Sequence, residues 1–165
     1  MTPMVEYRAR VIWDGNRGAG TFDYASYGRG YRVLIDDKPD LLGSANVAFR
    51  GDRERHDPED LFLAAVSSCH MLAYLALCAR NGVCVVAYED ASYGHLVHDA
   101  NGGGHFSEIV LRPRVVVADG ERELAALTLH ETAHARCFIA NSCRTPIRCE
   151  PTVCVDPKAS LEQPA

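Results

Sequence analysis

The chain has 165 residues, of which 47% are hydrophobic, and a formal net charge of −5. This length suits one domain with a sizeable core, so we expect a single domain over 1–165, with its core at about 5–156 and a tail over 157–165. Charges of both signs are scattered without a basic stripe, which argues against nucleic acid as a partner. We expect no membrane partner, because no uninterrupted apolar run approaches the roughly 20 residues that a membrane span needs.

The cysteine content points to a reducing compartment. Seven cysteines, an odd number, occur without a Cys-x-x-Cys pair, which disfavours a secreted disulfide scaffold, a zinc ribbon and a thioredoxin-type motif. The first residues also lack the basic and then apolar pattern of a secretory signal. We therefore expect a cytoplasmic protein.

The first third of the chain is typical of short strands. Alternating polar and apolar residues predict strands at Tyr7–Trp13, Thr21–Tyr24 and Tyr31–Ile35, separated by glycine-containing turns. The segment Asp36–Asp57 is polar and irregular, and we expect it to be the longest loop.

A long helix should follow this loop. Asp57 is suited to be its N-cap, Pro58 to its first position, and the acidic Glu59 and Asp60 to the positive end of the helix dipole. Asn81-Gly82 provides a stop, so the helix should run to about Arg80. Because it is apolar on nearly all sides, we expect it to be central and buried.

The remainder predicts a hairpin, a second helix and a final strand. Val83–Val97 and Phe106–Val117 should be long strands joined by the glycine-rich turn Asn101–Gly104, followed by a helix over Glu121–Arg136. A last strand is expected near Ile147–Val155. This order of elements is α+β and does not alternate as βαβ units do.

Two cysteines stand out as candidate reactive groups. Cys69 lies in the long apolar helix, and Cys137 follows Arg136 at the end of the second helix. A cysteine attacks peroxide as a thiolate, which a neighbouring cation stabilises, and a second cysteine can trap the resulting sulfenic acid as a disulfide. The carboxylate of Glu59 could hold such a cation in place.

The spacing of Glu59 and Cys69 has a consequence for assembly. Ten residues on one helix separate the two side chains by roughly 15 Å along its axis. An arginine held by that Glu59 cannot comfortably touch that Cys69, so the three groups should come from two chains. We therefore expect a two-fold homodimer with two composite sites.

The sequence resembles the OsmC/Ohr superfamily, which comprises the osmotically inducible and organic hydroperoxide resistance proteins. Three segments carry the resemblance, which spans roughly Tyr7 to Val155: Trp13-Asp14-Gly15 with Arg17-Gly18-Ala19-Gly20-Thr21, the helix start Asp57-Pro58-Glu59-Asp60-Leu61-Phe62-Leu63-Ala64-Ala65 with Ser67-Ser68-Cys69, and Cys137-Phe138-Ile139-Ala140-Asn141-Ser142. The last segment differs from the more familiar Cys-Pro-Val form, which suggests a less studied branch with a different substrate.

The resemblance implies a fold and an activity. The fold would be an intertwined α+β homodimer in which curved antiparallel sheets wrap central helices. The activity would be that of a thiol-dependent peroxidase acting on organic hydroperoxides, and on hydrogen peroxide as a further candidate, in the stress response. Cys69 would be the peroxidatic cysteine and Cys137 the resolving one, with Glu59 positioning an arginine. Arg17 matches the first-hairpin position best, and Arg50 is its rival. The partners would be a second copy, the peroxide and a dithiol reductant, with no cofactor.

Two alternatives remain open. His130-Glu131-Thr132-Ala133-His134 matches the H-E-x-x-H pattern, which on a helix places two histidines on one face for zinc with the glutamate as general base. Glu150 is the one tempting distant third ligand for such a zinc hydrolase. A non-enzymatic redox sensor or ligand-binding protein of the same fold is the other alternative.

The other candidate residues have plainer interpretations. His70 points about 100° away from Cys69 around the helix, which favours a core or interface role over that of a base. The other five thiols are expected to be structural or incidental, and the first two of them to be packing residues: Cys78, Cys84, Cys143, Cys149 and Cys154.

Overall fold

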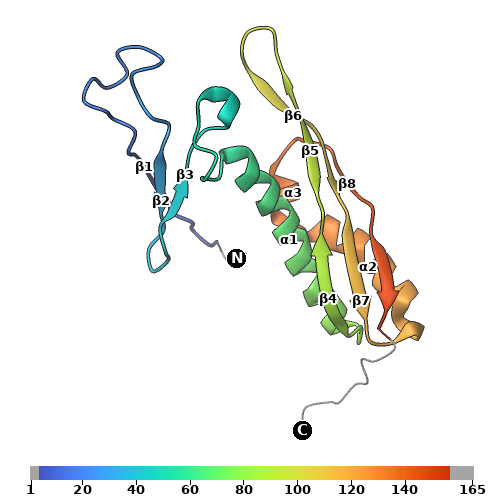
Figure 1. The fold of residues 1–165 in the computed structure, drawn as a ribbon. Helices are drawn as coiled ribbons and strands as arrows, with labels where there is room; N and C mark the ends of the chain where they lie inside the picture. The colour runs from blue at the N-terminus through green and yellow to red at the C-terminus, as the bar shows by residue number, and fades with distance from the viewer. Residues whose placement is uncertain (1–3, 157–165) are drawn as a thin grey trace. The chain divides into compact units, whose positions relative to one another are not determined.

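A computed structural model describes residues 4–156 of the chain as two compact units, the first ending at Phe62 and the second beginning at Leu63 (Figure 1). The first unit holds a small sheet and the second holds two further sheets with most of the helices. The mixed architecture confirms the α+β fold class. The single-domain boundary over 1–165 stays a prediction, and its tail over 157–165 falls outside the described residues.

The first unit is built on a three-stranded antiparallel sheet in the order β1-β2-β3. Strands β1 (Arg10–Trp13) and β2 (Tyr31–Leu34) lie within the segments that the sequence predicted as strands. Strand β3 (Leu41–Gly43) and the short 3-10 helix η1 (Val47–Phe49) fall inside the segment expected to be a loop. That segment is therefore more ordered than its polar composition indicated.

The strand expected at Thr21–Tyr24 was a wrong prediction, because these residues form turns and bends. The side chain of Asn16 accepts the backbone N–H groups of Gly18 and Gly20 at 2.9 and 3.0 Å. Both glycines have positive φ values, 107° and 58°, which suit turns and interrupt a strand. Local turn chemistry thus outweighs the β-propensity of the residues that follow.

Helix α1 (Pro58–Arg80) begins and ends where the sequence predicted. Its N-cap is Asp57, whose Oδ1 accepts the backbone N–H of Asp60 at 2.9 Å, while Oδ2 accepts the side-chain amide of Asn46 at 2.8 Å. At the other end the Asn81 side chain donates to the Leu77 carbonyl at 2.7 Å, and Gly82 takes a φ of 67°.

We expected α1 to be a central, buried helix. Within one chain this prediction is wrong, because only one side of the helix is buried. One stripe of the helix is buried, at Val66, His70, Tyr74, Leu77 and Cys78, and Leu72 on another face is 62% exposed. The buried positions recur every three or four residues, as expected of a helix with a single face on the core.

We expected no apolar segment to approach the length of a membrane span. Contrary to that expectation, α1 is long and apolar enough to cross a membrane. This is weak evidence for a span, because the core helix of a soluble protein meets the same criteria of length and hydropathy. The packing of its Tyr74 and Leu77 in the core cluster of the second unit accounts for the apolar composition of that stripe.

The second unit holds two three-stranded sheets. One has the order β4-β7-β9 and the other β5-β6-β8. Their bounds are β4 (Val85–Asp90), β5 (Tyr93–His98), β6 (Gly104–Leu111), β7 (Pro113–Val117), β8 (Ile147–Cys149) and β9 (Thr152–Val155). Strands β5 and β6 form the predicted hairpin, and β8 and β9 lie parallel to β6 and β7.

Each predicted long strand is thus divided in two. Pro113 is the first residue of β7 and Pro151 lies between β8 and β9, and neither offers an N–H to a neighbouring strand. At the same place the carboxylate of Asp90 accepts the backbone N–H of Arg112 at 2.7 Å and the hydroxyl of Ser67 at 2.5 Å. The Asp90 side chain thus takes the place of a neighbouring strand as the hydrogen-bond acceptor for the Arg112 backbone.

Two helices follow the hairpin. Helix α2 (Glu123–Arg136), preceded by the 3-10 helix η2 (Gly120–Arg122), matches the predicted second helix, and the short α3 (Phe138–Ser142) follows it. The core cluster of this unit joins Tyr74 of α1, Val115 of β7 and Ala126 of α2. The core therefore lies between two helices and a strand.

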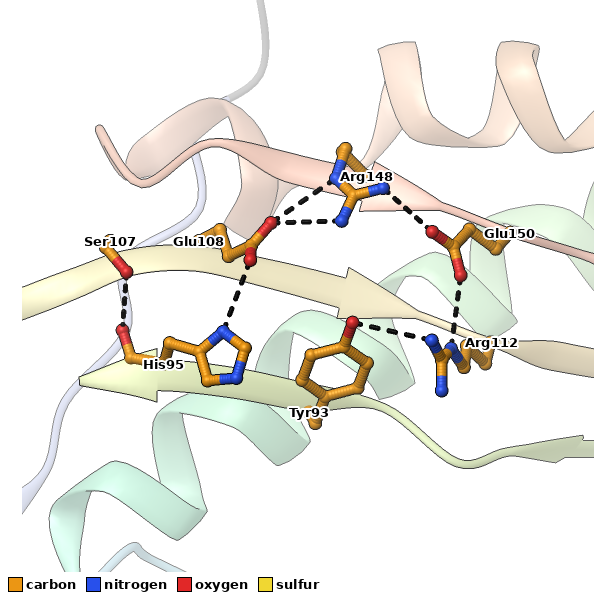
Figure 2. Close-up of polar contacts among 7 residues, drawn as sticks. All are labelled: Tyr93, His95, Ser107, Glu108, Arg112, Arg148 and Glu150. Carbon is orange, nitrogen blue, oxygen red and sulfur yellow. Dashed lines mark hydrogen bonds and ion pairs between the residues drawn. The ribbon is translucent and has the colours of Figure 1, made fainter.

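A network of charged side chains crosses the β5-β6-β8 sheet (Figure 2). Arg148 lies between two carboxylates, donating to Glu108 at 3.0 Å and to Glu150 at 2.8 Å. Glu150 also accepts from Arg112 at 3.1 Å, and His95 contacts Glu108 at 3.2 Å. The parallel strand β8 is thereby tied to its neighbour by side chains as well as by backbone.

Candidate functional site

Cys69 and Cys137, more than sixty residues apart in the sequence, are in contact in the second unit. Cys69 lies on α1 and is partly buried, and Cys137 lies fully buried between α2 and α3. A side-chain hydrogen bond between the two thiols contributes to a raised pKa of Cys137. The structure therefore brings together the two cysteines that the sequence singled out.

The surroundings of Cys137 keep its thiol protonated. Burial raises the pKa of Cys137 to about 11, although its sulfur accepts the backbone N–H of Ala140 at 3.4 Å, which opposes the rise. As the N-cap of α3, the side chain is held in one orientation. At neutral pH this residue is a positioned thiol and a poor first nucleophile.

The two candidate arginines, Arg17 and Arg50, line one groove in the first unit, with a volume of about 400 Å³. A third arginine there, Arg55, pairs with Asp14 at 3.5 Å and with Asp52 at 3.6 Å. Within residues 4–156 no carboxylate pairs with Arg17 or Arg50. Both remain available for an anionic or polar partner.

Glu59 lies in the first turn of α1. Burial, together with the nearby charges of Asp57 and Glu59, raises the pKa of Tyr31. Among the described ion pairs of the chain, none joins Glu59 to an arginine. The pairing of Glu59 with Arg17 or Arg50 stays a prediction.

The H-E-x-x-H segment does not assemble as the sequence suggested. The Nδ1 atom of His130 lies 3.0 Å from Nε2 of His70, and these atoms converge with the sulfur of Cys149. Among the described residues, that converging group includes neither His134 nor Glu131. Glu150, the tempting third ligand, is held by arginines (Figure 2).

Sequence reasoning missed this second cluster because no local spacing reveals it. His70 and Cys149 are 79 residues apart, and each was interpreted as structural. His70 is indeed fully buried, as its position on the helix predicted. Among the other thiols Cys78 is buried as expected, whereas Cys84 is exposed and is not a packing residue.

Taken together, the fold and the paired thiols define an α+β protein in which two helices bring a pair of cysteines into contact. The chain belongs to the OsmC-like protein family, whose model matches residues 51–152. No curated protein matches the chain.

Solved structures agree with this assignment. An OsmC-like protein of unknown function from Vibrio cholerae is 33% identical, with a TM-score of 0.81, over 90% of this chain and 100% of that one. An organic hydroperoxide resistance protein from Elizabethkingia anophelis is 20% identical, with a TM-score of 0.67, over 94% and 100% of the two chains. OhrB of Bacillus subtilis, also an organic hydroperoxide resistance protein, is 22% identical, with a TM-score of 0.56, over 90% and 98%. The last two show a shared fold.

Proposed function

We propose that this protein is a cytoplasmic thiol peroxidase that reduces organic hydroperoxides. The observation that carries the proposal is the contact between Cys69 and Cys137, in which a buried thiol lies against a less buried one. Membership in the OsmC-like family and the fold shared with organic hydroperoxide resistance proteins support it.

The proposed cycle begins at Cys69. Its thiolate attacks one peroxide oxygen, the O–O bond breaks, and the departing alkoxide takes a proton to become an alcohol. Cys69 is thereby oxidised by two electrons to a sulfenic acid. The neighbouring Cys137 is suited to the second step, because its side chain is hydrogen-bonded to that of Cys69.

The second half of the cycle restores the thiols. Cys137 attacks the sulfenic sulfur, water leaves, and a Cys69–Cys137 disulfide forms. A dithiol reductant then supplies two electrons and two protons by thiol–disulfide exchange. No cofactor takes part in these steps.

The arginine in this proposal comes from a second copy of the chain. Arg17, or its rival Arg50, would stabilise the thiolate and the departing oxyanion, with Glu59 holding it. The ten-residue spacing between Glu59 and Cys69 on α1 favours groups supplied by two chains. The exposed apolar face of α1, represented by Leu72, is consistent with a partner helix there.

The experiment is steady-state consumption of an organic hydroperoxide with a dithiol reductant. We expect Cys69→Ser to fall to the rate without enzyme, and the control Cys84→Ser, which changes an exposed thiol, to keep the wild-type rate. Full activity in Cys69→Ser would overturn the proposal. Thiol oxidation without turnover in the wild type would instead identify a redox sensor.

A further inference from the structure

Two imidazoles and a thiol converge in the second unit, apart from the proposed redox pair. His70 comes from α1, His130 from α2 and Cys149 from the end of β8. The Nε2 atom of His70 lies 3.0 Å from Nδ1 of His130 and 3.6 Å from Sγ of Cys149. All three candidate ligand atoms lie within 4.8 Å of one another.

These separations suit a small metal ion. A tetrahedral zinc centre has Zn–N bonds of about 2.0–2.1 Å and Zn–S bonds of about 2.3 Å. Such bonds place two nitrogen ligands about 3.3 Å apart, and a nitrogen and a sulfur about 3.6 Å apart. The observed nitrogen–sulfur separation equals that value, and the two nitrogens need to move apart by a few tenths of an ångström.

The two rings are held inside the second unit, since His70 is fully buried and only 3% of His130 is exposed. Their outward atoms, Nδ1 of His70 and Nε2 of His130, have no hydrogen-bond partner among the described residues. In the metal-free protein one of the two facing nitrogens donates its hydrogen to the other, so zinc binding requires that ring to move its hydrogen to its outward nitrogen. Tyr74 stacks on His130 at 3.8 Å between centroids and fixes that ring.

The carboxylates of Asp90 and Glu150 lie near the Cys149 thiol. Glu150 is neutralised by its ion pairs with Arg112 and Arg148, whereas no ion pair among the described residues involves Asp90. The Asp90 carboxylate can therefore offset part of the charge of a bound cation. Further titratable groups near the site are His134, whose ring lies 6.5 Å from that of His70, and Tyr88, which interacts with Cys149.

We propose that His70, His130 and Cys149 bind one Zn²⁺ ion, leaving a fourth position for water. Binding releases the Cys149 proton to solvent and forms one zinc–sulfur and two zinc–nitrogen bonds. The ion links α1, α2 and β8, so it stabilises the second unit of the fold. This site differs from the zinc hydrolase motif, because it uses His70 and Cys149 in place of His134 and Glu131.

The test measures zinc affinity of the reduced protein by competition with a chromogenic chelator under anaerobic conditions. We expect one zinc per chain in the wild type and in the control Cys154→Ser, which changes a partly buried thiol on β9, a strand of the other sheet. Cys149→Ser should lose more than the 10- to roughly 100-fold in affinity that loss of an outer-shell partner costs. Equal affinity in Cys149→Ser, or no binding by the wild type, would overturn the proposal.

Cobalt distinguishes this site from binding by the other thiols. With Co²⁺ in place of zinc, the wild type and Cys69→Ser should both show a thiolate-to-cobalt charge-transfer band, and Cys149→Ser should lack it. A band that disappears in Cys69→Ser and persists in Cys149→Ser would assign metal to the redox pair and contradict the inference.

A third measurement requires no substitution. Zinc should slow alkylation of Cys149 in the wild-type protein, as followed by peptide mass spectrometry, and leave alkylation of Cys154 unchanged. Zinc-independent labelling of Cys149 would count against the site even if the serine variant failed to fold.

Discussion

Cys137 and Cys69 share one contact but have different surroundings. Cys137 is fully buried with a raised pKa, whereas Cys69 is only partly buried. This difference favours an order of events in which peroxide meets Cys69 and the buried thiol reacts afterwards. The roles proposed for the two residues rest on this asymmetry.

The first prediction concerns the lifetime of the sulfenic acid. Cys137→Ser removes the thiol that faces Cys69, so the sulfenic acid on Cys69 should persist and be trapped by a dimedone-type reagent. Cys143→Ser is the matched control, since it changes a nearby thiol outside the pair. An unchanged sulfenic acid lifetime in Cys137→Ser would remove that residue from the resolving role.

At the residue scale the sequence predicted the thiol pair and missed the histidine cluster. Cys69 and Cys137 lie in segments that resemble those of a known family, and this resemblance can be recognised from the sequence alone. His70, His130 and Cys149 are brought together by the packing of two helices against a strand, which no spacing in the sequence encodes.

At the scale of elements, the start of α1 depends on a few local hydrogen bonds. Asp57 caps the helix through Asp60 and is held by Asn46. Asp57→Ala should lower the free energy of unfolding by about 1 kcal/mol, since a cap is lost, and Asp57→Ser should retain most of it. Denaturant unfolding measures both, and equal stability of Asp57→Ala and wild type would contradict the assignment of the cap.

The charged network on the β5-β6-β8 sheet predicts a pH dependence (Figure 2). Hydrogen bonds from Arg148 and His95 hold the pKa of Glu108 below its usual range. Stability that depends on its carboxylate is therefore present above the unfolded pKa of about 4.3 and is lost as the pH falls through the folded value. Added salt should reduce the effect, because these groups are exposed.

Unfolding of wild type and Glu108→Gln across this acid range checks the prediction. The variant should lose less stability on acidification than the wild type does, because it has no proton to bind at that position. Identical slopes in the two proteins would show that the Glu108 pairs do not contribute.

Element order was largely predictable, and strand length was not. Helices α1 and α2 carry caps or periodic apolar positions that appear in the sequence. The sequence predicts each long strand as continuous, because its residues favour β-structure throughout. The division beside Pro113 involves a tertiary hydrogen bond from the Arg112 backbone to Asp90, and the parallel pairing of β8 and β9 is equally non-local.

For the whole molecule the central question is whether one chain makes a complete site. Cys69 and Cys137 lie in the second unit, and Arg17 and Glu59 lie in the first. The proposed two-fold dimer places groups from two chains around each thiol pair. Variants that remove one contribution each can therefore complement one another.

Co-expression of Cys69→Ser with Arg17→Gln tests this arrangement. Alone, Cys69→Ser should be inactive, and Arg17→Gln should lose about 10²–10³-fold in rate, the scale for removal of one oxyanion-stabilising group. Statistical assembly gives one intact site in about half of the dimers, so about a quarter of wild-type activity should return. No recovery in a verified mixed dimer would contradict the composite site and favour one built within a chain.

Peptide mass spectrometry after one equivalent of an organic hydroperoxide shows whether the two thiols reduce the peroxide. We predict one Cys69–Cys137 disulfide per peroxide reduced, with one equivalent of alcohol released and the other five cysteines still reduced. A disulfide elsewhere, or a protein that reduces the peroxide while both thiols stay free, would contradict it.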